Sequence, residues 1–161
     1  RVYDELLGSA RRTVWLSTYA FFDGPRAFEI LGRRMDQVPE LRVTVLLNIQ
    51  RKRGDATPSD DLVRRFVERL WRTEWPGRSR PRVFYDPRAL DPEGGGGVLH
   101  AKAVVVDDEA VFITSANLTE AAQERNVELG ILVRDRAMAL SVSAHFQGLI
   151  DRRHLSELPG A

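Results

Sequence analysis

The sequence predicts an α/β fold, a layered α-β-α sandwich around a mixed, mostly buried central sheet. Short apolar runs rich in Val and Leu have the length of buried strands, and stretches of helical length separate them. Strands that are apolar on both faces need helices on both sides, which gives three layers. With 161 residues, of which 43% are apolar, the chain suits a single domain over residues 1–161.

The expected elements alternate between helix and strand. Pro25 suits the first turn of one helix, and Ser59 is expected to cap another whose early Asp60 and Asp61 complement its dipole. Two prolines and four successive glycines mark residues 86–97 as a loop. The expected order is a helix over 2–11, a strand over 13–20, a helix over 25–35, a strand over 41–47, a helix over 59–71, a strand over 82–85, the loop, strands over 100–106 and 110–114, a helical turn near 119–122, a strand over 126–133 and a helix over 136–152.

A hairpin is expected in the second half of the chain. The apolar runs 103–106 and 110–113 are separated by three acidic residues, so the simplest connection is a tight turn with residues 108–109 at its tip. In that register His100 lies opposite Asn117. Lys102 then lies opposite Ser115.

Side chains two positions apart share a face of a sheet, so these four polar groups point the same way. Singly, each has a bland explanation, because a histidine at the start of a strand is usually a half-exposed polar residue. Together they bring an imidazole, an ammonium, a hydroxyl and a carboxamide to the open end of the hairpin. This combination predicts a phosphate-binding site that holds a nucleophile or a proton carrier.

The same residues resemble a known motif. His100-x-Lys102-x4-Asp107-x6-Thr114-Ser115-x-Asn117 is similar to the His-Lys-Asp motif of the phospholipase D superfamily. Thr114 stands where the family usually has Gly, and we expect it to trim the space beside the site. The segment 126–129 resembles the family's next strand, and residues 9–19 resemble its opening helix and strand more loosely.

The resemblance implies a mechanism. In the family two such motifs face each other, and this sequence has a single His-x-Lys, so a homodimer or another motif-bearing chain is expected to supply the second. One His100 would attack phosphorus to form a phosphohistidine, while the other protonates the leaving oxygen and later activates water. The other expected roles are phosphate binding by Lys102, Asn117 and Ser115, orientation of the imidazole by Glu128, and a structural role in the turn for Asp107. No metal or other cofactor is implied.

Charge is distributed unevenly along the chain. Residues 51–88 contain eleven Arg and Lys but only six Asp and Glu, although the net charge of the whole chain is +1. Such an excess can neutralise nucleic-acid phosphates, or it can belong to a solvated helix face and a basic loop. The residues predicted to bind nucleic acid are Arg51, Lys52, Arg53, Arg78, Arg80 and Arg82.

Three functions stay open. The single motif most resembles small dimeric endonucleases acting on DNA or RNA, which occur in bacterial DNA-processing and phage-defence systems beside other subunits. A lipid phosphodiesterase or phosphatidyltransferase is the alternative. Trp71 and Trp75 could anchor such an enzyme to a membrane, could stack on bases in a nuclease, or could simply be core residues. The third is a non-catalytic nucleic-acid-binding subunit of a larger system.

Composition limits the setting. The sequence has no apolar run of about 18 residues, no N-terminal leader pattern and no Cys, which fits a reducing compartment. We therefore expect a cytoplasmic protein without a membrane span, and the resemblance together with the Arg-rich, Lys-poor composition implies a bacterial one. Since the chain starts at Arg1 rather than Met, we also expect it to be a fragment or a trimmed chain.

Overall fold

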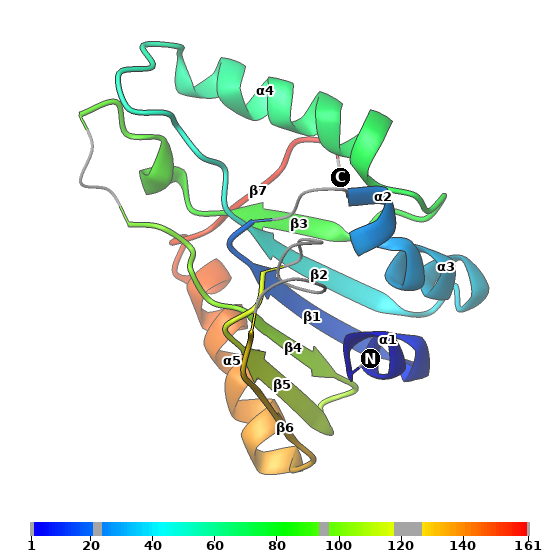
Figure 1. Ribbon diagram of the computed structural model, residues 1–161. Coiled ribbons are helices and arrows are strands. Elements are labelled where there is room, and N and C mark those ends of the chain that lie inside the picture. Colours follow the sequence, from blue (N-terminus) through cyan, green and yellow to red (C-terminus); the bar gives the residue numbers. More distant parts are fainter. Residues whose placement is uncertain (1, 21–23, 94–96, 118–126, 161) are drawn as a thin grey trace.

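The computed structural model describes residues 2–20, 24–93, 97–117 and 127–160 (Figure 1). Within these residues one mixed sheet of seven strands runs in the order β6-β5-β4-β1-β2-β3-β7. The strands are β1 (Thr13–Thr18), β2 (Arg42–Leu47), β3 (Arg82–Tyr85), β4 (Ala103–Val106), β5 (Ala110–Thr114), β6 (Gly130–Val133) and β7 (Ser156–Glu157). The mixed central sheet of the predicted sandwich is therefore confirmed.

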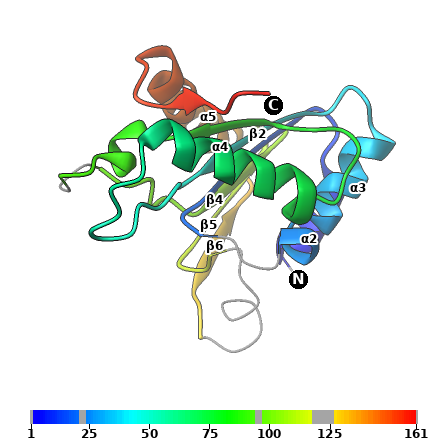
Figure 2. The ribbon, with the colours of Figure 1, turned by 90° about the horizontal axis from the view of Figure 1, so that it is seen from above.

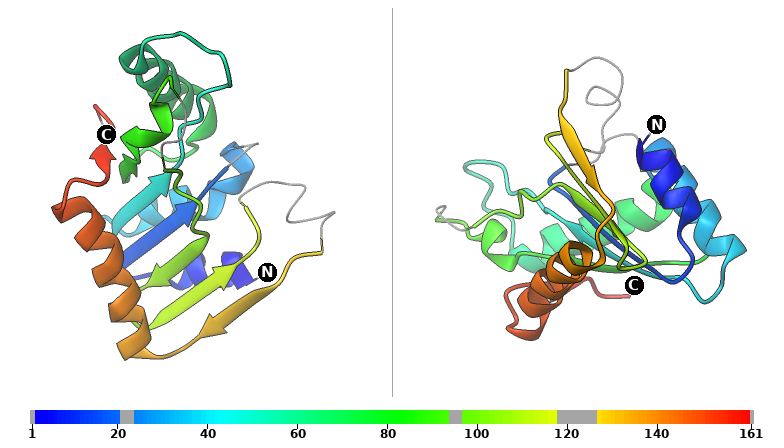
Figure 3. Two further views of the ribbon diagram at one scale, coloured as in Figure 1. Left: turned by 90° about the vertical axis from the view of Figure 1, so that its left-hand side faces the viewer. Right: turned by 90° about the horizontal axis from the view of Figure 1, so that it is seen from below.

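Helices cover both faces of this sheet (Figures 2 and 3). Apolar residues of the first four helices join one large buried cluster, whereas the last helix packs on the opposite face in two smaller clusters. The helices are α1 (Val2–Ser9), α2 (Gly24–Ala27), α3 (Glu29–Gln37), α4 (Ser59–Arg69) and α5 (Arg136–Asp151), with a π-helical turn η1 (Leu70–Glu74) and a 3₁₀ turn η2 (Pro87–Leu90). None of the helices in the described part of the chain is both long and apolar enough to cross a bilayer.

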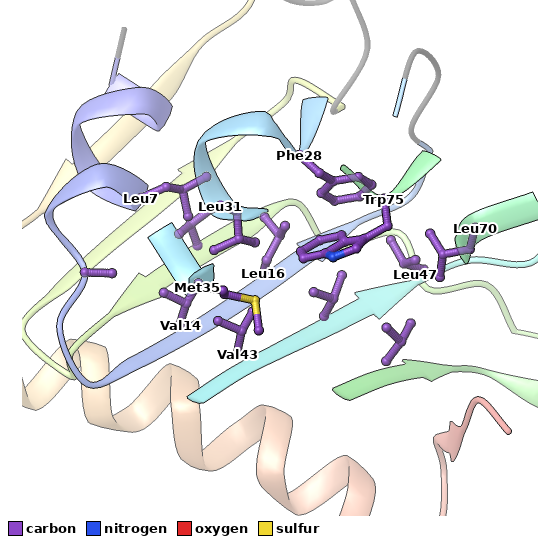
Figure 4. Packing of buried hydrophobic residues seen from close by; sticks show 14 of the residues in the cluster. Leu7, Val14, Leu16, Phe28, Leu31, Met35, Val43, Leu47, Leu70 and Trp75 are labelled. Atoms are coloured by element: carbon purple, nitrogen blue, oxygen red, sulfur yellow. The ribbon is translucent and has the colours of Figure 1, made fainter. Parts of the chain in front are cut away.

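The alternation within β1 shows why its residues form a central strand. Leu16 is fully buried on the face that α3 covers, where it lies close to Leu31 (Figure 4). Trp15 points to the opposite face and packs with Phe146 of α5, at 6.1 Å between ring centroids. A strand that is apolar on both faces needs a helix on each side, as this one has.

The directions of the strands decide where the functional groups meet. β1, β2 and β3 are parallel, so their carboxyl ends lie at the same end of the sheet. β4 runs antiparallel to β1, and Ser17 near the end of β1 pairs with Ala103 at the start of β4. The residues just before β4 therefore lie beside those that follow β1 and β2. We call this end of the sheet the site end.

The structure also corrects several expected elements. The helix predicted over 25–35 is divided into α2 and α3 at Phe28, whose side chain is buried against Trp75 with 5.4 Å between ring centroids. Ser59 is the first residue of α4 rather than its cap, because its hydroxyl donates to the carbonyl of Leu90 while Pro58 occupies the cap position. Further differences are η2 within the predicted loop and the unpredicted edge strand β7. The last predicted strand begins at Gly130 rather than 126, and the turn predicted near 119–122 lies outside the described residues.

Candidate active site

His100 and Lys102 lie at the site end, just before β4. The imidazole of His100 is exposed, whereas only 9% of Lys102 is accessible to solvent. The Lys102 ammonium donates to the carbonyl oxygen of His100 at 2.9 Å and lies 3.2 Å and 3.3 Å from the two ring nitrogens. The pair therefore presents an accessible imidazole directly against a buried positive charge, a combination that can support attack on a phosphate ester.

An aromatic residue completes this pair. The ring of Tyr19, just after β1, lies 4.8 Å from the His100 ring, and the Lys102 ammonium lies 5.7 Å from its centroid. The aromatic face stabilises the cation while leaving it few hydrogen-bond partners. Sequence reasoning missed Tyr19, because its proximity depends on the pairing of β1 with β4 across about 85 residues of chain. The sequence feature that could have pointed to Tyr19 is its position directly after the central strand β1.

Burial sets the electrostatics of Lys102. Removal of the ammonium from water lowers the pKa of Lys102, and the nearby carboxylate of Glu128 opposes that change. Burial thus leaves the Lys102 ammonium poorly solvated beside the imidazole, and in its protonated form it interacts more strongly with an incoming anion than an ammonium in water would.

The register of the hairpin differs from the prediction by one residue. The backbone N–H of Thr114 donates to the carbonyl of Lys102 at 3.1 Å, so Lys102 lies opposite Thr114 rather than Ser115. The tip falls on Asp107 and Asp108, which have positive φ angles of 56° and 55°, and not on residues 108–109. Asp tolerates this left-handed conformation better than most residues, which explains why the turn begins one position earlier.

Thr114 and Ser115 connect the hairpin to the segment before β6. The Ser115 hydroxyl donates to Glu128 at 2.5 Å and accepts the backbone N–H of Leu129 at 3.2 Å. The Thr114 hydroxyl donates to the carbonyl of Leu129 at 3.2 Å and accepts the N–H of Ala116. Thr114 thus supplies hydrogen bonds that the family's Gly could not make. The predicted contact between Glu128 and the imidazole stays a prediction.

Asn117 is half-buried, and its side-chain oxygen is enclosed without a hydrogen-bond partner among the described residues. An unpaired buried carbonyl costs free energy, so a group left in this state is a candidate for ligand contact. The observed register no longer places it opposite His100, so its part in phosphate binding stays a prediction.

Asp107 lies at the opposite end of β4 from Lys102. Its carboxylate accepts the backbone N–H groups of Arg11, Arg12 and Thr13 at 2.9, 2.6 and 2.9 Å. The carboxylate therefore joins the hairpin turn to the start of β1, in a position from which it cannot touch a phosphate at the site end.

The predicted nucleic-acid-binding cations divide into two groups. Lys52 and Arg53 follow β2 and are exposed, and Lys52 lies on the same side of the site end as Tyr19. Arg51 from the same cluster is committed to the loop: its guanidinium donates to the carbonyls of Leu90, Asp55 and Thr57 and to the hydroxyl of Ser59.

The second group lies at the far end of the sheet. Arg82 opens β3, the end opposite Tyr85, and forms a two-bond ion pair with Glu157 at 2.8 and 3.0 Å. Arg78 lies 3.7 Å from Asp36, and Arg80 lies over the Trp71 ring at 4.7 Å. The structure therefore does not bring these three residues to the site.

The other groups considered from the sequence have structural positions. Trp75 is buried and donates to the carbonyl of Ser79 at 2.9 Å, so it is a core residue and neither an anchor nor a stacking platform. Among the described residues no three His, Cys, Asp or Glu side chains are grouped so as to hold a metal ion.

Comparison with known proteins identifies the family of this chain. The family model described as "Cardiolipin synthase, PLD-like domain" matches residues 3–150. The DISARM protein DrmC of Bacillus paralicheniformis is 29% identical over 133 residues, which cover 82% of this chain and 48% of that protein. The chain thus spans about half the length of this curated relative.

Three solved structures share the fold. Nuc from Salmonella typhimurium, a phospholipase D family member, has a TM-score of 0.66 at 17% identity over 97% of this chain and 88% of its own. NucT from Helicobacter pylori has a TM-score of 0.67 at 16% identity, with 93% and 86% covered. Phosphatidylserine synthase from Haemophilus influenzae Rd KW20 has a TM-score of 0.62 at 18% identity, with 98% and 36% covered. Because the family model matches most of the chain, including the whole His-Lys-Asp motif, the protein belongs to the family of PLD-like domains.

Proposed function

We propose that this chain is a phosphodiesterase that cleaves nucleic acid through a phosphohistidine intermediate. The observation that carries the proposal is the exposed imidazole of His100 against the buried ammonium of Lys102. An exposed imidazole can reach a phosphorus atom, and a desolvated cation beside it stabilises the negative charge that develops on the non-bridging oxygens.

The proposed reaction has two steps. In the first, a ring nitrogen of His100 forms a bond to phosphorus while the bond to the leaving oxygen breaks, and a second imidazole gives that oxygen a proton. In the second, the same imidazole takes a proton from water, whose oxygen attacks phosphorus and breaks the phosphorus–nitrogen bond. Lys102 and Asn117 hold the phosphate oxygens, and Lys102 supplies positive charge that metal ions supply in other phosphodiesterases. Glu128 and Ser115 position the site.

The second imidazole is proposed to come from a second copy of the chain. Apolar side chains are exposed on the β5–β6 edge next to Ser115 and Glu128, including Ile131 (63% exposed) and Leu129 (77% exposed). Ile113 pairs with Ile131 on the same face and is also exposed. In a dimer whose two-fold axis lies beside this edge, the apolar patch of one chain would be buried against the same patch of the other, and the two copies of His100 would come close together.

Nucleic acid is the substrate class that several observations favour. Lys52 lies at the site end on the same side as Tyr19, where it can contact a neighbouring phosphate. The single His-x-Lys motif also resembles the small single-motif endonucleases, and the folds of Nuc and NucT match this chain over most of its described length.

Two alternative functions are tested together with the nuclease activity. The shared fold of phosphatidylserine synthase makes a phosphatidyl ester the second candidate substrate. Similarity to a DISARM protein supports a role in bacterial phage defence, as a catalytic or a non-catalytic subunit.

The test is a cleavage assay in EDTA on single- and double-stranded DNA and RNA, with wild type beside His100→Ala and the mass measured by light scattering. We expect cleavage by a dimer that survives EDTA and falls by at least about a thousandfold in the variant. Loss of activity in EDTA that added divalent metal restores would reject the phosphohistidine chemistry. Turnover of phosphatidyl esters alone would reject the nuclease, and nucleic-acid binding that His100→Ala leaves unchanged without any cleavage would indicate a binding subunit.

A further inference from the structure

A cavity of about 550 Å³ opens at the site end, and the proposed reaction does not use it. It lies between the segments that follow β1 and β2 and one side of α4. Its chemically informative lining residues are Tyr19, Asn48, Lys52, Arg65, Phe66 and Arg69. Tyr19 belongs to both places, because its ring forms part of the cavity wall and lies 4.8 Å from the His100 ring. The cavity therefore adjoins the position of the scissile phosphate.

Asn48 is the unusual residue in this wall. It directly follows β2, only 6% of it is accessible to solvent, and its side-chain oxygen has no hydrogen-bond partner among the described residues. A buried unpaired carbonyl costs about 1–3 kcal/mol, which the fold could avoid with an apolar residue. The oxygen thus lacks a donor, and a ligand in the cavity that Asn48 lines can supply an N–H or O–H group.

The remaining lining supplies positive charge and aromatic surface. Lys52 and Arg65 are exposed, and no ion pair joins either of them to a described residue. Phe66 of α4 and Tyr19 add aromatic surface to the wall. Aromatic faces, a hydrogen-bond acceptor and cations are the three features that bind a base, its polar edge or sugar, and a phosphate.

We propose that this cavity is a subsite for the nucleoside next to the scissile phosphate. The base lies against the aromatic wall, an N–H or O–H of the nucleoside donates to Asn48, and the next phosphate contacts Lys52 and Arg65. The choice of a nucleic acid rests on the proposed function. An acyl chain would have no donor for Asn48 and no negative charge for Lys52 and Arg65.

Calorimetric titration of the full chain, carrying His100→Ala to prevent turnover, tests this subsite. Nucleoside 5′-monophosphates are the probes, with inorganic phosphate and ribose 5-phosphate as references. We expect nucleotides to bind at least about tenfold more tightly than either reference, and Asn48→Ala to remove most of that advantage while leaving phosphate binding within about twofold.

A matched pair of arginines provides the control. Arg65→Ala removes a cation of the wall, whereas Arg64→Ala removes its exposed neighbour on α4, which pairs with Asp61 at 2.9 Å and does not line the cavity. We expect Arg65→Ala to weaken nucleotide binding by about tenfold and Arg64→Ala by less than twofold. Thermal unfolding of each variant shows that the fold is intact.

Several outcomes would overturn the subsite: nucleotides that bind no better than inorganic phosphate, equal effects of the two arginine variants, or an Asn48→Ala effect seen only on binding to phosphatidylglycerol vesicles. The titration measures binding alone, so its result tests the subsite independently of the proposed phosphohistidine reaction. A chain that binds nucleotides through Asn48 but cuts no phosphodiester would uphold the subsite and overturn the proposed reaction.

Discussion

At Lys102 the fold places a positive charge where burial works against it. Burial lowers the pKa of this ammonium below its ordinary value of 10.5. The folded state then binds the proton less tightly than the unfolded state, so the protonated residue costs stability at neutral pH. That cost falls as the pH rises from the folded-state pKa towards 10.5. A cost of this kind is typical of a functional residue rather than a structural one.

The pKa of Lys102 leads to a pH prediction. The ammonium attracts phosphate and its neutral form does not, so activity is lost as the pH rises through the lowered pKa of Lys102. We expect the alkaline limb of the pH–rate profile to fall below pH 10.5. In Lys102→Arg the guanidinium stays charged, so the limb should move to higher pH, while the larger group reduces the rate by about 10–100-fold. If the alkaline limb does not move in Lys102→Arg, that limb reports the titration of a group other than Lys102.

Asp107 allows a prediction about stability. Asp107→Asn keeps the shape and tolerates the positive φ angle, but replaces a charged acceptor of three backbone N–H groups by a neutral one. We expect a loss of about 1–3 kcal/mol in the free energy of unfolding, measured with urea, and retention of activity in the folded variant.

Glu109→Ala is the matched control for Asp107. Its carboxylate forms an exposed ion pair with Arg12 at 2.9 Å in the same turn, and such pairs contribute at most about 1 kcal/mol. Normal stability but no activity in Asp107→Asn would show that Asp107 takes part in the chemistry.

Residue identities in the motif could be predicted, but their pairing could not. The spacing of His100 and Lys102 indicated that they lie together, and the structure places them in contact. The hairpin register depends on which two acidic residues adopt the left-handed conformation, and Asp107 does so while it also holds the start of β1. A contact of that kind, between residues more than 90 positions apart, leaves no trace in local sequence.

At the scale of elements, β6 is an edge strand of the sheet formed by the described residues, and exposed apolar side chains lie on it and on the neighbouring β5. Edges of this kind invite association unless they are protected. Because this edge lies beside Ser115 and Glu128, we assign it to contact with a second copy of the chain rather than with an unrelated partner.

Ile131→Lys tests the assignment of this edge. Because 63% of Ile131 is exposed, the substitution should change the free energy of unfolding by less than about 0.5 kcal/mol. In the proposed dimer the new lysine would be buried in the interface as an unpaired charge, which opposes association. We therefore expect light scattering to show a monomer and the cleavage rate to fall by at least about a hundredfold. Val2→Lys is the matched control, because Val2 is an exposed apolar residue (41%) of α1, which packs on the opposite face of the sheet. A dimer that survives Ile131→Lys would place the interface elsewhere.

The types of most elements followed from periodicity, whereas their boundaries followed from tertiary contacts. The apolar runs predicted β2, β3, β4 and β5 to within a few residues, because a buried strand needs little besides apolar side chains. The break at Phe28 could not be predicted, since it depends on the position of Trp75 about 45 residues later. The short edge strand β7 exists only because β3 offers it a partner.

At the scale of the whole molecule, the arrangement of strands sorted residues that the sequence grouped by charge alone. The basic stretch 51–88 contains both ends of β3, so its cations divide between opposite ends of the sheet. Lys52 and Arg65 line the cavity at the site end, and Arg82 pairs with Glu157 at the other. Local charge counts predicted a basic surface, but only the topology selects which cations can serve the site.

The central place of β1 also has a consequence for synthesis. β1 pairs with β2 on one side, but its other neighbour, β4, begins only at Ala103. A nascent chain that has emerged only as far as the first hundred residues therefore exposes the open side of a strand that will later be fully enclosed. Such edges are prone to aggregate, so ribosome pausing before Val106 emerges should favour chaperone capture, and pausing after it should favour completion of the sheet.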